Sequence, residues 1–388
     1  MRDSTNAQAP VEKKAIIAMS GGVDSSVAAL LCQQQGFDCV GVTLALTDNS
    51  DRGLPEEAFS GERTCCSVDD VADARSVAFR LGMPFYVFNF KEAFRREVMD
   101  RFAAAYQRGE TPNPCIDCNR YIKFAKLMHR GEEIGFPYVA TGHYARVEQD
   151  RATGRWLLKK GLDENKDQSY MLYSLTQWEL SRLLLPLGGL TKEETRRLAE
   201  EHGFVNARKR DSQDICFVPD GDYAAFIRRW TGRDFPPGDF VGTQGEVYGQ
   251  HKGIIHYTVG QRKGLGLSFP QPMFVKKLDV DRNQVVLAKG EELFSREVVA
   301  RDINLISQES IETPLRVKAR VRYRQVEQPA TAIQTGPDEL RVIFDEPQRA
   351  ITPGQSLVLY DGDTVVGGGK IVPSDQIVAS GNREPQAE

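Results

Sequence analysis

Short apolar runs alternate with amphipathic segments through the first 150 residues of the chain. Four runs bounded by glycine, proline or polar residues predict buried strands, at 15–19, 38–46, 84–90 and 138–140. Three segments between them predict helices, at 25–35, at 68–81 and in a stretch that ends at 108. Strand and helix in this alternation are typical of a parallel sheet with helices on both faces.

The pattern changes after residue 150. Residues 146–160 predict a hairpin that turns at Thr153-Gly154, and helices are expected to begin near Thr176 and at a capping box from Thr191 to Glu194. Beyond 295 only strand patterns remain, separated by proline and glycine turns, and they predict a small β-barrel. These strands are expected at 315–324, 330–334, 340–344, 357–360 and 364–372.

We therefore expect three folded parts and two tails. The boundaries are a disordered tail at 1–13, an α/β domain at 14–220, a small central domain at 221–294, a β-barrel at 295–378 and a disordered tail at 379–388. The α/β domain is expected to bind a nucleotide and to carry the catalytic site, because the chemically distinctive motifs fall in it.

The composition narrows the class of protein. Of 388 residues, 40% are hydrophobic and 27% are charged, which is ordinary for a soluble globular protein. No apolar run is long enough to span a bilayer, and residues 1–13 lack the apolar core of a signal peptide. We therefore expect a cytoplasmic protein with no membrane partner. The formal net charge of -4 still leaves room for a local surface that binds nucleic acid.

The sharpest motif is the phosphate loop, residues 20–26, which reads Ser-Gly-Gly-Val-Asp-Ser-Ser and lies between a predicted strand and a predicted helix. Its glycines let the backbone approach an anion, the helix that follows presents free N–H groups, and the serine hydroxyls add donors. Asp24 is a candidate ligand for Mg²⁺ between phosphates. No Walker motif and no complete Gly-x-Gly-x-x-Gly occurs. The loop resembles that of the ATP pyrophosphatases, which cleave ATP to AMP and pyrophosphate.

Seven cysteines without an export signal argue for reduced thiols and against a disulfide framework. Cys118 precedes a helix predicted over 121–130, so we place it at a helix N-terminus, where the dipole raises the thiolate fraction. Cys216 follows the basic run 208–210 and is a second candidate reactive thiol. Cys115 and Cys118 match half of a zinc site, but the sequence offers no second half. Packing is the preferred interpretation of Cys32 and Cys39, whereas the role of Cys65 and Cys66 stays open, with packing favoured over chemistry.

Further motifs narrow the resemblance. The sequence resembles the bacterial tRNA-specific 2-thiouridylases in blocks that run in order over nearly the whole chain. These blocks are 20–26, 111–114 with Cys118-Asn119, 141–144, 165–170, Asp211 with 215–217, 260–266 and 352–356. Together the blocks are far more specific than the phosphate loop alone.

The resemblance implies a fold, a reaction and a set of partners. The fold is an α/β N-terminal domain with a parallel, adenine-nucleotide-hydrolase-like sheet, followed by a small central domain and a C-terminal β-barrel. The reaction is ATP-dependent 2-thiolation of the wobble uridine of tRNA, through an adenylated base and a cysteine persulfide. ATP and Mg²⁺ are the implied cofactors. The implied partners are tRNA, a persulfide sulfur-donor protein and a reductant.

The resemblance also assigns roles to residues. Cys216 carries the sulfur as a persulfide, and Cys118 is the nucleophile that releases it, which leaves a disulfide between them. Because Cys216 has to move, we expect mobility around 205–220. The implied ATP-binding residues are Ala18, Met19, Ser20, Gly21, Gly22, Val23, Asp24, Ser25, Leu44 and Gly142. The implied tRNA-binding residues are Asn113, Pro114, Cys115, His143, Lys166, Asp167, Gln168, Arg322, Tyr323 and Gln355.

Several alternatives stay open. Position 115 is aspartate in the better-known form of the family, and here Cys115, Cys118 and Cys216 allow a [4Fe–4S] cluster as in some related thiolases. A tRNA cytidine thiolase or a GMP synthetase-like amidase would share the phosphate loop, and a non-catalytic tRNA-binding protein would retain the fold. For tRNA binding itself, cations at every second position from 316 to 324 predict a phosphate-binding stripe on one strand face.

Overall fold

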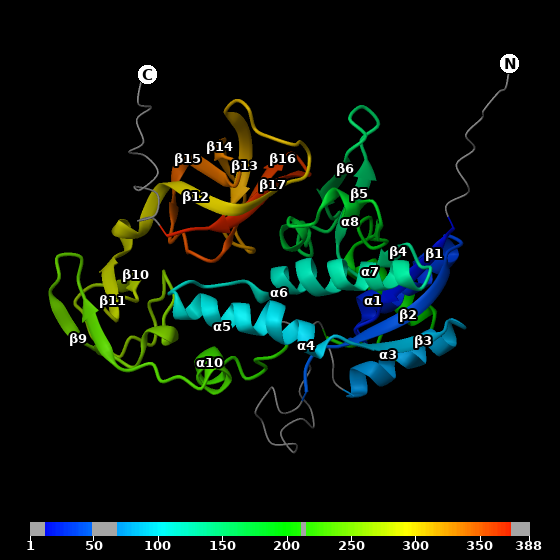
Figure 1. Cartoon of the computed structure of the whole chain (residues 1–388), viewed down its shortest axis with the longest axis horizontal. Helices are drawn as coiled ribbons and strands as arrows, with labels where there is room; N and C mark the ends of the chain where they lie inside the picture. The colour runs from blue at the N-terminus through cyan, green and yellow to red at the C-terminus, as the bar shows by residue number, and fades with distance from the viewer. Residues whose placement is uncertain (1–11, 49–67, 211–214, 374–388) are drawn as a thin grey trace.

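The computed structural model describes residues 12–48, 68–210 and 215–373 (Figure 1). Its first domain is built on a five-stranded sheet of order β3-β2-β1-β4-β7, in which all neighbours run parallel. The strands are β1 (Lys14–Ala18), β2 (Asp38–Ala45), β3 (Phe85–Asn89), β4 (Tyr138–Ala140) and β7 (Leu183–Leu184). The predicted parallel sheet is confirmed, and the two-residue strand β7 was not predicted.

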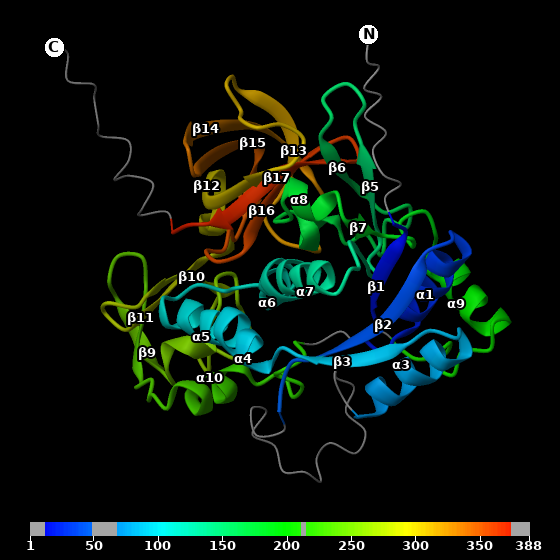
Figure 2. The same cartoon turned by 45° about the vertical axis from the view of Figure 1, so that its right-hand side comes forward.

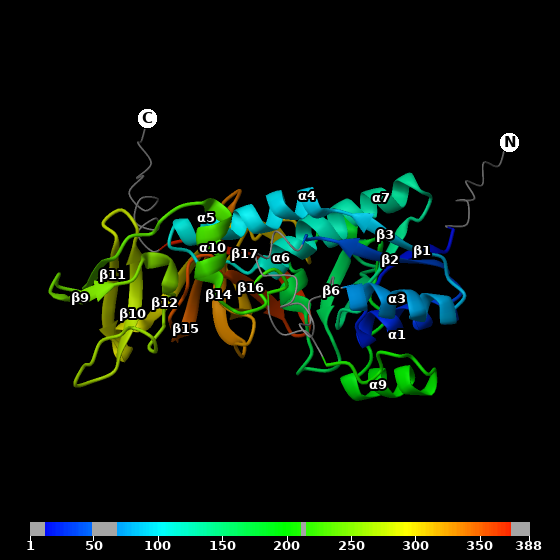
Figure 3. The ribbon, with the colours of Figure 1, turned by 90° about the horizontal axis from the view of Figure 1, so that it is seen from below.

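Helices cover both faces of this sheet, as Figure 3 shows. On one face lie α1 (Val23–Gln34), α3 (Val68–Arg80) and α9 (Lys192–Glu201), with α9 packed on α1. Successive side chains of β1 point to opposite faces of the sheet: Ile16 belongs to the buried cluster on one face and Ile17 to the cluster on the other. The central strand is therefore excluded from water on both sides.

Two long helical segments lie on the opposite face and run through the middle of the molecule (Figure 1). The first consists of α4 (Lys91–Phe94), the π-helical turns η2 (Arg95–Met99) and α5 (Asp100–Gln107). The second consists of α6 (Pro114–Asp117), the π-helical turns η3 (Cys118–Lys126) and α7 (Leu127–Glu133). Segments η2 and η3 contact each other, and α7 contacts β4. Wide π-helical turns are frequent at functional sites, and η3 begins at Cys118.

The second segment corrects the predicted position of Cys118. The helix begins at Pro114 and not at 121, because Asn113 caps it by accepting a hydrogen bond from the N–H of Cys115 at 3.2 Å. Proline is well suited to the first helical position. Cys118 therefore lies in the second turn and is 7% exposed. The thiol that lies in the first turn is Cys115, which is exposed.

The predicted hairpin is confirmed as β5 (Ala145–Gln149) and β6 (Trp156–Lys160). Its place in the fold was not predicted. Strand β6 pairs with β17, so the hairpin extends the sheet of the C-terminal barrel. A short 3-10 helix, η4 (Ser169–Leu172), follows it. The helices expected near Thr176 and Thr191 are α8 (Gln177–Leu180) and α9, and each begins with a complete capping box.

The central part lies at the end of the molecule opposite the parallel sheet (Figure 2). It begins with α10 (Tyr223–Thr231) and holds a four-stranded sheet of order β10-β11-β8-β9. Its remaining elements are β8 (Gly238–Val241), β9 (Val247–His251), η5 (Ile254–His256), β10 (Met273–Asp279), β11 (Gln284–Lys289) and η6 (Gly290–Leu293). Trp230 ties α10 to α5 by donating to the carboxylate of Asp100 at 2.8 Å.

The last part is a closed barrel of six antiparallel strands. They are β12 (Phe294–Leu305), β13 (Leu315–Arg320), β14 (Gln328–Gly336), β15 (Glu339–Arg349), β16 (Ser356–Asp361) and β17 (Thr364–Ile371). The barrel closes because β12 pairs with both β15 and β17. The predicted barrel is confirmed. Strand β12 was missed because charged residues interrupt its apolar alternation.

The barrel corrects the predicted stripe of cations. Strand β13 ends at Arg320, so the last two cations, at 322 and 324, lie beyond it, and the five do not share one strand face. Arg316 is paired with Asp345 at 2.8 Å. Arg320 has a side chain only 16% exposed and is paired with Glu327 at 2.7 Å. The alternation ends because the chain turns between β13 and β14.

Some predictions fall outside the described residues. They concern Cys65, Cys66, Asp211 with the adjoining 212–214, and most of the two tails. Among the described residues, no helix combines the length and the apolar character that crossing a membrane requires.

Candidate active site

The order of the parallel strands reverses between β1 and β4, since β2 and β3 lie on one side of β1 and β4 lies on the other. In open α/β sheets, ligands bind beyond the carboxyl ends of the strands at such a point. The loops after β1 and β4 meet there, because a Cβ on Gly142 would lie 2.7 Å from the backbone carbonyl carbon of Asp24. The structure therefore brings Gly142 against the phosphate loop.

The phosphate loop turns tightly onto the N-terminus of α1. Gly21 has a φ of +73°, and a Cβ there would lie 2.2 Å from the carbonyl oxygen of Asp70, so only glycine fits. Helix α1 has no side-chain hydrogen bond at its N-cap, Gly22, which leaves its first N–H groups open to an anion. The hydroxyls of Ser25 and Ser26 donate to the carbonyl of Gly22 at 3.0 and 3.1 Å. These hydroxyls stiffen the loop, whereas we expected them to point at phosphate.

A pocket opens directly beyond this loop, and we call it the nucleotide pocket. Its space, including the part open to solvent, is about 750 Å³. The residues predicted for ATP that line it are Ala18, Met19, Ser20, Asp24, Ser25, Leu44 and Gly142, and those predicted for tRNA are His143 and Gln168. Gly21, Gly22 and Val23 do not line it, and Val42, Leu46, Lys123 and Thr141 line it without having been predicted.

Asp24 is engaged by its neighbours. Its two carboxylate oxygens accept hydrogen bonds from the ammonium of Lys192 at 2.7 and 2.8 Å, and the hydroxyl of Tyr144 donates to one of them at 2.8 Å. Lys192 reaches the loop from the first turn of α9 and is 9% exposed. This geometry does not fit the predicted role of Asp24 as an open Mg²⁺ ligand. The ion pair instead anchors the phosphate loop to α9, because the ammonium of Lys192 is neutralised by both oxygens of Asp24.

Cys118 and Cys216 share one buried cluster despite their separation in sequence. Cys118 belongs to the cluster and the partly buried Cys216 packs against it. The residue after Cys216, Phe217, has its ring centroid 5.8 Å from that of Phe94 and 5.3 Å from that of Phe102. Both of these rings belong to the helical segment that contacts η3, and η3 begins at Cys118. The cluster also extends into the central part and the barrel, so the local link between the two thiols is that Phe217 packs on the helical segment that contacts η3.

The barrel holds the loop that leads to α6. The side-chain amide of Gln355 donates to the carbonyl of Thr111 at 2.7 Å, and the N–H of Thr111 donates to the carbonyl of Pro353 at 2.8 Å. A Cβ on Gly354 would lie 2.8 Å from the nitrogen of Thr111, so the approach is as close as glycine allows. Gln355, predicted to contact tRNA, thus fixes the backbone two residues before Asn113.

The other residues predicted for tRNA differ in exposure. Asp167 is 6% exposed, and its carboxylate accepts hydrogen bonds from the N–H groups of Gly161 and Ser169 at 3.2 and 3.1 Å. This carboxylate is enclosed by protein, which does not fit a direct contact with RNA. The hydroxyl of the partly buried Tyr323 donates to the backbone carbonyl of Asp167 at 3.2 Å. Arg322 is exposed, and Lys166 is partly exposed.

Three family models cover most of the chain in order. They are a tRNA methyl transferase HUP domain at 13–220, a tRNA methyl transferase PRC-barrel domain at 224–289 and an aminomethyltransferase β-barrel domain at 295–371. A tRNA-specific 2-thiouridylase MnmA of Clostridioides difficile is 50% identical over 364 residues, 94% of this chain and 99% of the relative. This chain belongs to the family of tRNA-specific 2-thiouridylases.

A second relative agrees with this family membership. The tRNA-specific 2-thiouridylase MnmA of Acetivibrio thermocellus is 49% identical over 360 residues, 93% of this chain and 99% of the relative. Among solved structures, a 4-thiouridine synthetase in a complex with RNA and bound ATP is 19% identical with a TM-score of 0.34, over 57% of this chain and 50% of that one.

Several residues at the site of this 2-thiouridylase family member were not assigned from the sequence. Asn206 is 2% exposed and donates to the carbonyl of Gly21 and the hydroxyl of Ser26, both at 2.9 Å. Nothing in its surroundings in the sequence marked it. Lys192 did carry a signal, because a cation in the first turn of a helix opposes the helix dipole and is therefore unusual. Lys123 was considered only as a neighbour of Cys118, yet it lines the nucleotide pocket.

His143 is a neutral hydrogen-bonding group at physiological pH. Its Nδ1 lies 2.8 Å from the hydroxyl of Thr141, and its ring packs on Phe124 with centroids 5.9 Å apart. Burial lowers the pKa of His143 to about 3, and the positive charge of Lys123 acts in the same direction. An uncharged imidazole at the edge of the nucleotide pocket suits contact with a nucleobase.

The stability of the protein is expected to report this pKa. The pKa of His143 is near 6.5 in the unfolded chain and far lower in the folded protein. The unfolding free energy that the neutral ring contributes is therefore fully present above pH 6.5. It is lost by ~1.4 kcal/mol per pH unit as the pH falls from 6.5 toward the pKa of the folded state. Between pH 7 and pH 5 the wild type should lose ~2 kcal/mol more unfolding free energy than His143→Gln, measured with urea. Equal losses in the two proteins would show that the ring protonates freely in the folded state.

Proposed function

We propose that this protein is a tRNA-uridine 2-sulfurtransferase, which places sulfur on C2 of the wobble uridine in an ATP-dependent reaction. The observation that carries the proposal is that Lys123 lines the nucleotide pocket from η3, the same short segment that begins at Cys118. A site for ATP activation and a thiol are thus separated by only one to two helical turns. The name of the relatives, tRNA-specific 2-thiouridylase, describes a reaction that needs both.

The first step makes the base reactive. The C2 carbonyl of uridine is a poor electrophile with a poor leaving group, and adenylation of its oxygen corrects both. We assign to the nucleotide pocket the attack of this oxygen on the α-phosphorus of ATP, from which pyrophosphate leaves. The N–H groups at the start of α1 are placed to bind the charge of the departing pyrophosphate. We assign to Leu44 a packing contact with the adenine, and Gly142, which lacks a side chain, lets the nucleotide approach the backbone.

The second step delivers sulfur. A donor protein loads Cys216 as a persulfide. The thiolate of Cys118 then attacks the inner sulfur of this persulfide, which is the one bonded to the Cβ of Cys216. The S–S bond of the persulfide breaks, hydrosulfide leaves, and a Cys118–Cys216 disulfide forms. Hydrosulfide adds to C2, AMP departs with the former carbonyl oxygen, and loss of a proton leaves 2-thiouridine. A dithiol reductant returns both cysteines to thiols, which is why a reductant is among the proposed partners.

Both intermediates have to be kept from water, because water would hydrolyse the adenylate and dilute the hydrosulfide. Cys118, 7% exposed within the core cluster, meets this requirement. The target base must leave its stack to approach it. We propose that Asn113, Pro114 and the exposed Cys115 surround the extruded base, with His143 and Gln168 at the edge of the nucleotide pocket. Lys166, Arg322 and Tyr323 are proposed to contact tRNA farther out.

The proposed cofactors are ATP and the Mg²⁺ that accompanies its phosphates. Within residues 12–48, 68–210 and 215–373, no group of three or more His, Cys, Asp or Glu side chains is arranged to hold a metal ion. The three cysteines as placed here therefore do not fit a [4Fe–4S] cluster, and no step is assigned to one.

The proposal is tested by pyrophosphate release from ATP with and without unmodified tRNA substrate. We expect release to be stimulated at least ~10-fold by tRNA and to be insensitive to ammonia or glutamine, since the RNA supplies the nucleophilic oxygen. Stimulation by an amide donor without RNA would favour a GMP synthetase-like amidase. Tight tRNA binding without any pyrophosphate release would favour a non-catalytic tRNA-binding protein.

A further inference from the structure

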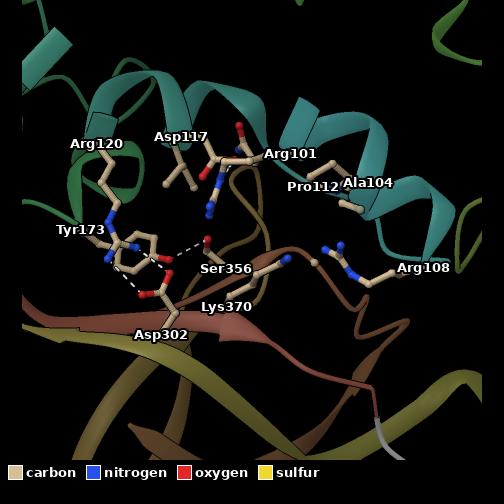
Figure 4. Close-up of a pocket in the computed structure, with 14 residues that line it drawn as sticks. Arg101, Ala104, Arg108, Pro112, Asp117, Arg120, Tyr173, Asp302, Ser356 and Lys370 are labelled. Atoms are coloured by element: carbon tan, nitrogen blue, oxygen red, sulfur yellow. Dashed lines mark hydrogen bonds and ion pairs between the residues drawn. The ribbon is translucent and has the colours of Figure 1, made fainter. Parts of the chain in front are cut away.

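A second pocket lies where the first domain meets the barrel, and we call it the interdomain pocket (Figure 4). Its space, including the part open to solvent, is about 720 Å³. One wall is formed by α5, the loop after it, α6 and the start of η3, and the other by residues of β12, β16 and β17 and the loop at 354. The segment formed by α6 and η3 borders both pockets, because Arg120 lines this one and Lys123 lines the nucleotide pocket.

One face of α5 forms a basic hollow. Arg101, Ala104, Ala105 and Arg108 all line the pocket, and their spacing of three, four and seven residues places them on one side of a helix. Ala104 lies between Arg101 and Arg108 in Figure 4, and its small side chain leaves space between the two arginines. Neither arginine is needed to hold the core, since their side chains are 43% and 54% exposed.

Positive charge is in excess around this hollow. The cations that line it are Arg101, Arg108, Arg120 and Lys370, and the lining carboxylates are Asp117 and Asp302. Glu110, beside the pocket, pairs with both Arg108 and Lys370 at 3.0 and 2.7 Å, so four cations face three carboxylates.

The arginines at this hollow are held to different extents, and Arg101 lies over the ring of Tyr121 at 4.7 Å from its centroid. Arg120 is committed to Asp302 through two hydrogen bonds of 2.6 and 3.0 Å. Arg101, in contrast, lies 3.6 Å from Asp117, which is longer than an ordinary hydrogen bond. Arg108 donates two hydrogen bonds of 3.1 and 3.0 Å to Glu110, so it can turn only its remaining N–H groups toward a ligand. An arriving phosphate can therefore recruit the guanidinium of Arg101 and the N–H groups of Arg108 that do not bind Glu110.

The position of the pocket indicates which anion it takes. Pro112 and Asn113 line it, and Asn113 also caps the helix whose first turn carries Cys115. Cys115 and Cys118 do not line the pocket, but Asn113, Ile116 and Arg120 of the same helical segment do, so a base extruded toward the thiols would have its neighbouring backbone within one or two helical turns of the opening. The remaining lining is mostly polar or charged, with no broad apolar wall for a separate base or a small apolar ligand.

We propose that the interdomain pocket binds a backbone phosphate of tRNA directly beside the uridine that is modified, with Arg101 and Arg108 as its phosphate-binding residues. This inference rests on the proposed function and adds to it a means of fixing the position of the RNA chain relative to Cys118. A phosphate held at a fixed place relative to Cys118 determines which nucleotide of the loop is extruded, without reading its sequence. The barrel completes the pocket through Lys370 and Ser356, which gives the barrel a direct role in placing the substrate.

The double variant Arg101→Gln, Arg108→Gln tests the pocket. Its affinity for an anticodon stem–loop RNA should fall ~10- to 100-fold at 0.1 M salt, and the slope of log affinity on log salt should become shallower by ~0.7 for each lost contact. Arg197→Gln is the matched control, because Arg197 is also an exposed arginine in an ion pair, 3.7 Å from Glu201 on α9. Its affinity should equal that of the wild type.

Two further measurements separate phosphate binding from a general effect on folding. A single uncharged methylphosphonate linkage beside the wobble uridine should weaken binding to the wild type and leave binding to the double variant unchanged. Ala104→Trp, which fills the hollow without changing its charge, should weaken RNA binding while thermal unfolding stays within a few degrees of the wild type. The proposal would be overturned if a methylphosphonate at each of the two linkages flanking the wobble uridine changed the RNA affinity of the wild type and of the double variant equally. It would also be overturned if Ala104→Trp bound RNA with the affinity of the wild type.

The outcome also distinguishes the two levels of inference. If the wild type thiolates tRNA and binds the stem–loop while the arginine variants behave like Arg197→Gln, the pocket proposal is wrong and the proposed function stands. If the wild type neither binds the stem–loop nor releases pyrophosphate in its presence, both are wrong.

Discussion

Replacement of Cys118 by serine should lower the formation of 2-thiouridine by on the order of 10³-fold or more, while tRNA-stimulated pyrophosphate release continues. The reason is that Cys118 acts only after adenylation, when it attacks the persulfide on Cys216. The variant should still accept sulfur, so intact-protein mass spectrometry after incubation with a persulfide donor should show one added sulfur atom. Cys216→Ser should lose thiolation equally but should gain no sulfur.

Cys39→Ser is the matched control for both variants. Cys39 is 4% exposed in the same domain, and burial raises the pKa of its thiol to about 11, with Asp38 adding to the effect. Such a thiol is protonated and inert at neutral pH. Its Sγ donates to the carbonyl of Phe37 at 3.4 Å, a bond that a serine hydroxyl can replace. Full thiolation by Cys118→Ser or Cys216→Ser would remove the two-thiol mechanism.

Gly142→Ala should lower kcat/KM for ATP about 100-fold with little effect on RNA binding. The added Cβ would lie 2.7 Å from the backbone carbonyl carbon of Asp24 and from the nitrogen of Ser25, so the phosphate loop has to shift. A displacement of about 1 Å in a group that positions a substrate can cost on the order of 10²-fold in rate. The measurement is steady-state pyrophosphate release at varied ATP with saturating tRNA.

Gly189→Ala is the control for this prediction, because a Cβ at Gly189 would meet no atom within 4 Å. It should behave as the wild type. If Gly142→Ala used ATP as well as Gly189→Ala, the loop after β4 would not be in contact with the bound nucleotide, and the nucleotide would have to be placed elsewhere.

The parts of the fold that sequence predicts well are those set by local patterns. The strand at 15–19, the turn at 20–22 and the helix after it depend on an apolar run, two glycines and a dipole, which are all adjacent in the chain. The capping box at Thr191 is equally local, and the structure contains both of its hydrogen bonds. These local signals were enough to place the phosphate loop at the end of β1.

The parts that sequence did not predict depend on contacts between distant residues. The pairing of β6 with β17 joins Lys159 to Thr364, and the bond from Lys192 to Asp24 crosses 168 residues. No pattern near either partner specifies the other. The start of the helix before Cys118 is a different case, because the Asn113-Pro114 pair is itself a local helix-start signal and could have placed it.

The most direct measurement uses purified protein, ATP, a persulfide donor, a dithiol and a tRNA transcript that lacks modifications. Nucleoside mass spectrometry of the digested tRNA should show that uridine at the wobble position has exchanged its 2-oxygen for sulfur, with one AMP and one pyrophosphate released for each. Unchanged uridine at that position alongside continued ATP cleavage, or sulfur found on another base, would contradict the mechanism built on Cys118, Cys216 and the nucleotide pocket.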